Sequence, residues 1–320
     1  DGLTGLGGAD TFVIPAAGGA DTISDLAVGN VADIVTVAAG ATVVATLTGN
    51  FTATAGTQNL GSALADFKII GQSAAETVDL TLATVTTAAA DGFTVVTASS
   101  GATTMSSGDD KVTSTGTGAL NGLAGVDTII NTSGASTITG GVGVDLITGG
   151  GAVDTIVLGT ATADADRIIT FTSTTDKVKN TVTLLNATDA TITNAGNISG
   201  SATVDAAIII SATATQYVFS NAAFDLNTSL NAFNTTPNGT TAAAIVTAAL
   251  SALNATATTT LDATFLVTET VLFMLDGTTG TSGALFAFTN STAAGNTFDA
   301  GELVLLGVTD AVMVTGDAIL

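Results

Sequence analysis

A nine-residue repeat constrains the fold of this chain more than any other feature of its sequence. From Gly122 the chain reads GLAGVDTII, NTSGASTIT, GGVGVDLIT and GGGAVDTIV, which are four consecutive units of nine residues. The third unit matches the pattern Gly-Gly-x-Gly-x-Asp-x-apolar-x at every fixed position, and a large apolar residue recurs at 129, 138, 147 and 156. Such a period indicates a solenoid, in which each unit buries its apolar face against its neighbours.

The other three units depart from the pattern in different ways. In the first unit Leu123 replaces the second Gly, and in the fourth Ala152 replaces the third Gly. The second unit carries Ser136 at the position of the Asp and Asn131 at its first position. A weaker block opens the chain, where Asp10 completes one unit and Asp21 a half-unit, and beginning inside a repeat suggests that further repeats precede Asp1.

Both blocks end in a similar segment. Asp21 starts the sequence DTISDL and is followed by Asp33, and Asp166 starts DRIITF and is followed by Asp176. A solenoid needs such capping strands because an open end exposes its apolar stack.

The sequence predicts an all-β fold, in which parallel β-roll blocks are combined with β-sandwich-like segments and one short helix near the C-terminal region. Thr-rich, β-branched stretches favour strands, and an alanine-rich run from about Thr240 to Asn254, preceded by Asn238, favours the helix. The expected domains are a partial repeat block with capping strand at 1–37, a β connecting region at 38–104, the main β-roll with capping strand at 105–180, and a C-terminal β domain with the helix and a secretion signal at 181–320.

Charge and composition exclude several functions. The chain has 27 acidic and five basic residues and a net charge of −22, so that it repels nucleic acid and anionic membranes and attracts divalent cations. It contains neither Cys nor His, which removes thiol and Ser-His-Asp catalysis and disulfides. No apolar run reaches the roughly 18 residues of a membrane span. We therefore expect a protein that is not an enzyme, does not insert into membranes, and binds a metal cation.

The repeats suit calcium, which takes six to eight oxygen ligands from carboxylates and backbone carbonyls. Their glycines permit tight turns with positive φ, and their Asp residues supply charge. Gly and Asp also occupy turns in other β proteins, and this alternative is strongest for the incomplete repeats. The candidate calcium-site residues are Gly122, Gly125, Asp127, Gly134, Ser136, Gly140, Gly141, Gly143, Asp145, Gly149, Gly150, Asp154, Gly8, Asp10, Asp21, Asp166 and Asp176.

Residues 1–37 and 105–180 resemble the repeats-in-toxin (RTX) family of type I-secreted bacterial proteins. The resemblance implies that each nonapeptide makes half a turn of a parallel β-roll and that an ion lies between the loops of repeats n and n+2. One site would join the loops 122–127 and 140–145. A second would join 131–136 and 149–154, and it would be weaker because Ser136 lacks a carboxylate.

Two functions are consistent with this resemblance. The first is a secreted, extracellular structural protein of the cell surface, which assembles with its own copies under calcium control as an S-layer or filament subunit and attaches to a cell-surface polysaccharide. The C-terminal parts of bacterial S-layer proteins are similar in mixing RTX repeats with β segments. The second is the calcium-folded secretion module of an RTX hydrolase or adhesin. Asp299 and Glu302 are expected to lie in a solvated turn.

Overall fold

The computed structural model describes residues 1–17, 19–30, 32–61, 63–64, 66–85, 92–179, 208–210, 216–219, 226–255, 259–261, 270–276, 282–291, 298–299, 301–311, 313 and 318–319. The chain forms two compact units, Asp1–Val157 and Leu158–Leu320. Much of the expected C-terminal domain, including 180–207 and 314–317, lies outside the described residues.

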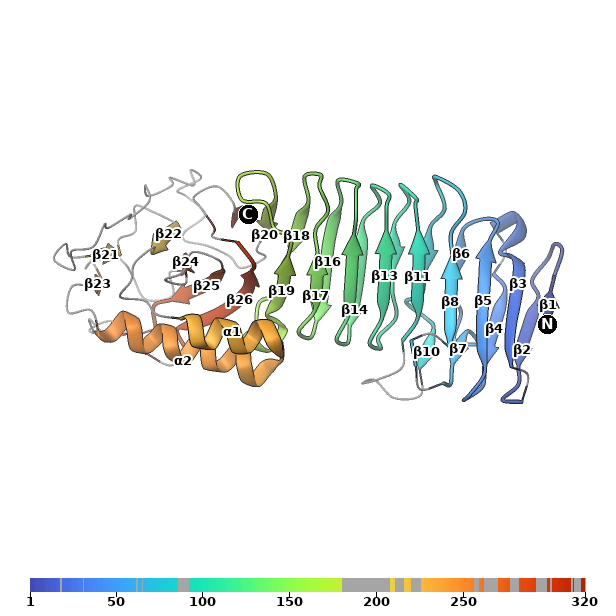
Figure 1. The fold of residues 1–320 in the computed structure, drawn as a ribbon, viewed down its shortest axis with the longest axis horizontal. Coiled ribbons are helices and arrows are strands. Elements are labelled where there is room, and N and C mark those ends of the chain that lie inside the picture. Colours follow the sequence, from blue (N-terminus) through green and yellow to red (C-terminus); the bar gives the residue numbers. More distant parts are fainter. Residues whose placement is uncertain are drawn as a thin grey trace. The chain divides into compact units, whose positions relative to one another are not determined.

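Unit 1 is a parallel β-solenoid, whose strands stack side by side in Figure 1. One sheet, sheet A, contains β1 (Gly2–Leu3), β3 (Ala20–Leu26), β5 (Thr42–Leu47), β8 (Phe67–Ile70), β11 (Thr94–Thr97), β13 (Lys111–Ser114), β15 (Thr128–Asn131) and β17 (Leu146–Thr148). Sheet B contains β2 (Thr11–Ile14), β4 (Ile34–Val37), β7 (Gln58–Asn59) and β10 (Thr84–Val85). Sheet C contains β6 (Phe51–Thr52), β9 (Val78–Asp79), β12 (Thr103–Thr104), β14 (Leu120–Ala124), β16 (Thr137–Val142) and β18 (Thr155–Val157).

The coil length in the repeat block confirms the β-roll. Thr128 pairs with Leu146 in sheet A, and Thr137 pairs with Thr155 in sheet C, so that one coil takes 18 residues. Two nonapeptides therefore make one turn, with one strand in each sheet. The recurring apolar residues point into the narrow space between the sheets, where Ile129 and Ile147 are fully buried.

The coils of residues 38–104 belong to the same solenoid. The chain there passes through sheets A, C and B in turn, and the coils are longer, since Val43 pairs with Phe67 and Lys68 with Thr94. Coils of three strands enclose a wider space, and aromatic side chains fill it: the rings of Phe67 and Phe93 meet edge to face at 5.2 Å. Strands therefore continue from the first repeat block to the second.

Unit 2 combines a mixed sheet with helices. β26 (Leu303–Thr309) pairs in parallel with β19 (Asp166–Ile169) and antiparallel with β25 (Gly283–Thr289), which pairs antiparallel with β24 (Thr270–Asp276). The remaining strands are β20 (Lys177–Lys179), β21 (Ile208–Ile210), β22 (Gln216–Phe219), β23 (Thr259–Leu261) and β27 (Ala318–Ile319), and short 3₁₀ turns lie at Val28–Asn30 in unit 1 and Thr162–Asp164 in unit 2.

The described part of unit 2 has two helices, whereas the sequence predicted one. α2 (Gly239–Ala255) is the predicted helix, and the side-chain oxygen of Asn238 caps it by accepting hydrogen bonds from the N–H groups of Thr240 and Thr241. α1 (Asn227–Thr235) was missed. It is short and polar, and it is stabilised by burying Leu230 and Phe233, which share one helix face.

Candidate metal site

The repeat block has two edges, where the chain passes between sheets. The first edge comprises the loops from sheet C to sheet A, at residues 105–110, 125–127 and 143–145, with the strand ends that enter them. The second edge comprises the loops from sheet A to sheet C, at 115–119, 132–136 and 149–154, with the strand ends that enter them. The two loop pairs that the sequence predicted to share ions lie on adjacent coils, one pair on each edge.

On the first edge, buried carboxylates form a ladder between coils. The backbone N–H of Asp110 donates to Oδ1 of Asp127 at 2.7 Å, and the N–H of Asp127 donates to Oδ1 of Asp145 at 2.7 Å. All three side chains are at most 1% exposed. Each carboxylate thus accepts a hydrogen bond from a backbone N–H group in the preceding coil. Without the carboxylate, this buried N–H group would lack an acceptor.

The second carboxylate oxygen of Asp127 has no hydrogen-bond donor among the described residues, although it is buried. It lies 2.2 Å from the position that a Cβ on Gly122 would take, and the carbonyl oxygen of Gly140 lies 2.4 Å from the same position. The corresponding oxygen of Asp110 differs, since it accepts hydrogen bonds from the N–H and the hydroxyl of Ser106. Two oxygens that converge in a buried place need a proton or a cation between them.

The pKa values of these acids follow from their surroundings. Burial, together with the charges of Asp145, Asp110 and Asp109, raises the pKa of Asp127 to about 9, although the hydrogen bond from the N–H of Asp110 acts in the opposite direction. Burial likewise raises the pKa of Asp110 to about 7. Both shifts disfavour the anion, and a cation bound on this edge would reverse them.

Glycines allow the loops of the first edge to stack this closely. Gly125 and Gly143 have φ of +129° and +124°, which L side chains rarely adopt. A Cβ on Gly143 would lie 1.9 Å from the carbonyl oxygen of Gly125, and one on Gly141 would lie 2.1 Å from that of Leu123. The repeat glycines are therefore required by contacts between coils as well as by the turns themselves.

The second edge has a different polar arrangement. Oδ1 of Asp154 accepts a hydrogen bond from the N–H of Ser136 at 2.8 Å, and its Oδ2 accepts one from the N–H of Gly150 at 3.0 Å. The side-chain amide of Asn131 donates to the same Oδ1 at 2.8 Å. Gly134 and Gly149 lie in these stacked loops, and a Cβ on Gly134 would lie 1.8 Å from the carbonyl oxygen of Gly116.

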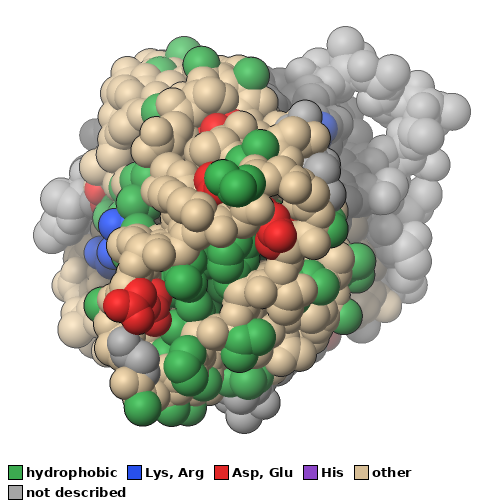
Figure 2. Space-filling view, turned by 90° about the vertical axis from the view of Figure 1, so that its right-hand side faces the viewer, with side chains coloured by type: hydrophobic (Ala, Val, Ile, Leu, Met, Phe, Trp, Pro, Cys, Tyr) green, Lys and Arg blue, Asp and Glu red, His purple; other side chains and the backbone are tan. Residues whose placement is uncertain are grey.

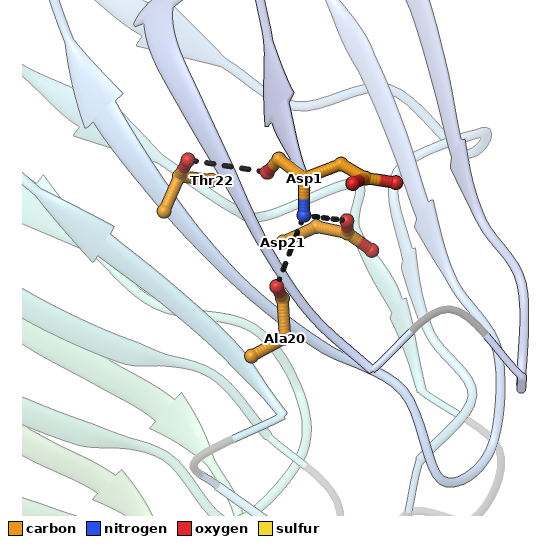
Figure 3. Close-up of polar contacts among 4 residues, drawn as sticks. All are labelled: Asp1, Ala20, Asp21 and Thr22. Carbon is orange, nitrogen blue, oxygen red and sulfur yellow. Dashed lines mark hydrogen bonds and ion pairs between the residues drawn. The ribbon is translucent and has the colours of Figure 1, made fainter.

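The candidates of the first block lie in earlier coils of the same solenoid. Oδ1 of Asp21 is 2.8 Å from the backbone nitrogen of Asp1, which also donates to the carbonyl oxygen of Ala20 (Figure 3). The N–H of Asp10 donates to Oδ1 of Asp33 at 3.0 Å. These contacts repeat the ladder geometry of the main block. Gly8 has φ of +120° and faces open space.

The strand register places Asp21 and the main ladder in one column along sheet A. Between them, the same column holds apolar side chains, and every member after Asp1 is buried. The column, called the sheet A column below, consists of Asp1, Asp21, Val43, Phe67, Phe93, Asp110, Asp127 and Asp145.

The remaining candidates lie in unit 2. Asp166 is buried at the start of β19, and Oδ2 of Asp176 accepts the N–H of Thr172 and closes a turn. The expectation of a solvated turn at Asp299 and Glu302 is wrong for Glu302. Its carboxylate is buried and accepts hydrogen bonds from the N–H groups of Ser291 and Asp299, because the turn folds back over it.

The sequence-based site candidates did not include two acids that the structure places in equivalent positions, Asp110 and Asp66. Asp110 precedes Asp127 by one coil of 17 residues, so that it falls out of the nine-residue phase. Asp66 packs against Gly61 as Asp127 packs against Gly122, with Oδ2 at 2.2 Å from the position of a Cβ in both cases. The spacing Gly-x-x-x-x-Asp is common to both pairs and would have identified Asp66.

Among the described residues, no three acidic side chains lie close enough together to hold a metal ion by themselves. The convergent oxygens on the first edge come instead from carboxylates and backbone carbonyls. Neither helix in the described ranges is long and apolar enough to cross a membrane. The chain matches no protein-family model, and no curated protein shows significant similarity to it.

Proposed function

We propose that this chain is a calcium-dependent structural protein of the cell surface, exported by type I secretion, which assembles with its own copies into an S-layer or filament. The observation that carries the proposal is that Oδ2 of Asp127, which is buried and has no hydrogen-bond donor among the described residues, lies beside the carbonyl oxygen of Gly140. A cation between the two loops removes the cost of that arrangement.

Calcium fits this donor set better than other metals. The groups on the first edge are hard oxygen donors, and the chain has no His or Cys to favour zinc or copper. The carboxylates of Asp127 and Asp145 and the carbonyl of Gly140 would hold the ion. Mixed carboxylate and carbonyl donors suit the irregular coordination of calcium, whereas magnesium requires a near-octahedral shell and retains its water.

Bound calcium would link folding to the extracellular environment. The ladder places carboxylates on successive coils, and the pKa of Asp127 near 9 reflects their burial first and the like charges of their neighbours second. Extracellular modules bind calcium at about 0.1 to 1 mM, well above cytosolic levels. The repeat block would therefore remain incompletely folded before export and fold outside the cell.

The net charge and the exposed apolar side chains of the chain support self-assembly under the control of calcium. Copies with a net charge of −22 repel one another until cations neutralise them. On the surface of unit 1, Leu6 and Val13 are 76% and 67% exposed. Figure 2 shows apolar side chains on one face with acidic side chains around them. Exposed apolar patches are features through which copies associate.

A calcium series on the whole chain tests the proposal. Far-ultraviolet circular dichroism should show a gain of β structure in millimolar calcium, and light scattering and negative-stain microscopy should show ordered sheets or filaments that dissolve in chelator. Magnesium at the same concentration is the control and should have little effect. A chain that binds calcium but stays a monodisperse monomer would instead support the secretion module of a hydrolase or adhesin. A chain that binds no calcium would defeat the proposal itself.

A further inference from the structure

Asn131 joins two coils at a buried position on the second edge. It ends β15 and is 1% exposed. Its side-chain amide nitrogen donates to the carbonyl oxygen of Gly134 in its own loop and to Oδ1 of Asp154 in the next coil. The amide nitrogen therefore bridges a backbone carbonyl and a carboxylate of adjacent loops, which are the two kinds of oxygen that calcium joins in proteins. Oδ1 of Asn131 itself is buried without a hydrogen-bond donor among the described residues.

The first edge has no such bridge at the corresponding place. Because the repeat is nine residues long, Asn131 corresponds to Gly122, Gly134 to Gly125, Ser136 to Asp127, and Asp154 to Asp145. Gly122 contributes no side chain between the carbonyl and the carboxylate. A group from outside the chain would take that place on the first edge.

The two edges differ at two corresponding positions, where the first edge has Gly122 and Asp127 and the second has Asn131 and Ser136. This difference explains why their polar contacts differ. A Cβ on Gly122 would lie 2.2 Å from Oδ2 of Asp127, so that a side chain at this position is incompatible with the Asp five residues later. On the second edge the residue five positions after Asn131 is Ser136, whose side chain is shorter. The pair Asn131 and Ser136 therefore occupies the place on the second edge that Gly122 and Asp127 occupy on the first edge.

We propose that the Asn131 amide takes the place of a calcium ion on the second edge. The adjacent loops of the second edge are then joined without metal, and calcium binds along the first edge only. The inference rests on the proposed function for its statement about calcium. Asp154 is the acceptor for the N–H groups of Ser136 and Gly150 as well as for Asn131, and hydrogen bonds to a carboxylate are stronger than those between neutral groups. The second edge would then be formed before calcium arrives and would present the first edge to the ion.

Thermal unfolding in chelator tests the bridge without calcium. Asn131→Ala should lower the Tm by about 5 °C, in chelator and in calcium alike, because it removes a buried bridge that the ion does not contact. Thr137→Ala is the matched control. Thr137 is an exposed residue at the start of β16, the next strand along the chain, and its substitution should change the Tm little. A Tm that is unchanged in chelator, or that falls only in calcium, would overturn the inference.

Counting bound calcium tests the exclusion of the ion. The double variant Asn131→Gly with Ser136→Asp restores the Gly and Asp of the first edge, and the folded chain should bind one more calcium ion than the unmodified chain. An unchanged count in a variant that circular dichroism shows to be folded in calcium would refute the exclusion. If the unmodified chain and the double variant both bind no calcium, the proposed function fails, and the chelator experiment still decides whether Asn131 holds the second edge.

Discussion

The backbone N–H of Asp127 donates a 2.7 Å hydrogen bond to Oδ1 of Asp145, which lies 18 residues further along the chain. The same contact joins Asp110 to Asp127 one coil earlier. These bonds place carboxylates inside the edge of the solenoid, where they satisfy backbone groups but lose their hydration. The stability of the repeat block should therefore depend on whatever neutralises these acids.

Asp127→Asn should affect stability in opposite directions with and without calcium. In chelator the neutral amide can donate to the carbonyl of Gly140, whereas Asp127 must first take up a proton against its ordinary pKa of 3.8, and we expect a gain of about 1–3 kcal/mol for the variant. In calcium the variant should lose the stabilisation that the ion gives to the unmodified chain. Urea unfolding under both conditions measures this. Asp79→Asn, at a solvent-exposed hydrogen bond in β9, is the control and should show neither effect.

Stability in chelator should fall as the pH rises. Burial raises the pKa of Asp127 to about 9 and that of Asp110 to about 7, from an ordinary value of 3.8. The folded state therefore binds more protons than the unfolded state between pH 3.8 and these values, and the stability that it gains is lost as the pH passes through 7 and 9. Thermal unfolding in chelator from pH 5 to pH 9 should show a decreasing Tm. Calcium should flatten this dependence, and a Tm that increases over the range would contradict the prediction.

Gly143→Ala should be more damaging than Gly8→Ala, although both glycines have similar positive φ, +124° and +120°. A Cβ at 143 would meet the carbonyl oxygen of Gly125 at 1.9 Å, whereas none of the surroundings of Gly8 lies within 4 Å. Backbone strain is thus common to both variants, and the clash is specific to one. We expect the free energy of unfolding of Gly143→Ala to be lower by about 1–3 kcal/mol, the usual cost of overpacking. Equal losses would show that only the turn conformation matters.

Calcium removal should loosen the solenoid unevenly. Val43, Phe67 and Phe93 occupy the sheet A column where the repeat block has carboxylates, so that β5, β8 and β11 need no cation there. Hydrogen exchange in chelator should accelerate in β15 and β17 more than in β5 and β8. Uniform acceleration along unit 1 would mean that the ion stabilises the solenoid as a whole rather than its repeat block.

Local patterns predicted much of the fold. The nine-residue period predicted a solenoid, and the resemblance to RTX proteins implied a coil of two repeats, which Thr128 pairing with Leu146 confirms. The alanine-rich run after Asn238 predicted α2. Both signals are local, because a repeat that buries one face, or a capped helix, needs few contacts with distant residues. α1 was missed because Leu230 and Phe233 stabilise it through burial, which its polar sequence does not reveal.

The sequence alone determined which residue types occupy the edges, since the glycines, the acids and their spacing can all be read from the repeat. Only the tertiary structure decided what each of them does. Coils of 17 residues bring Asp110 onto the same column as Asp127, although it lies outside the nine-residue phase. Among the described residues, the stacking of adjacent loops leaves Oδ2 of Asp127 without a donor and gives Asp154 the amide of Asn131. These differences arise between coils, where residues about 18 positions apart meet, and a pattern within one repeat carries no record of those contacts.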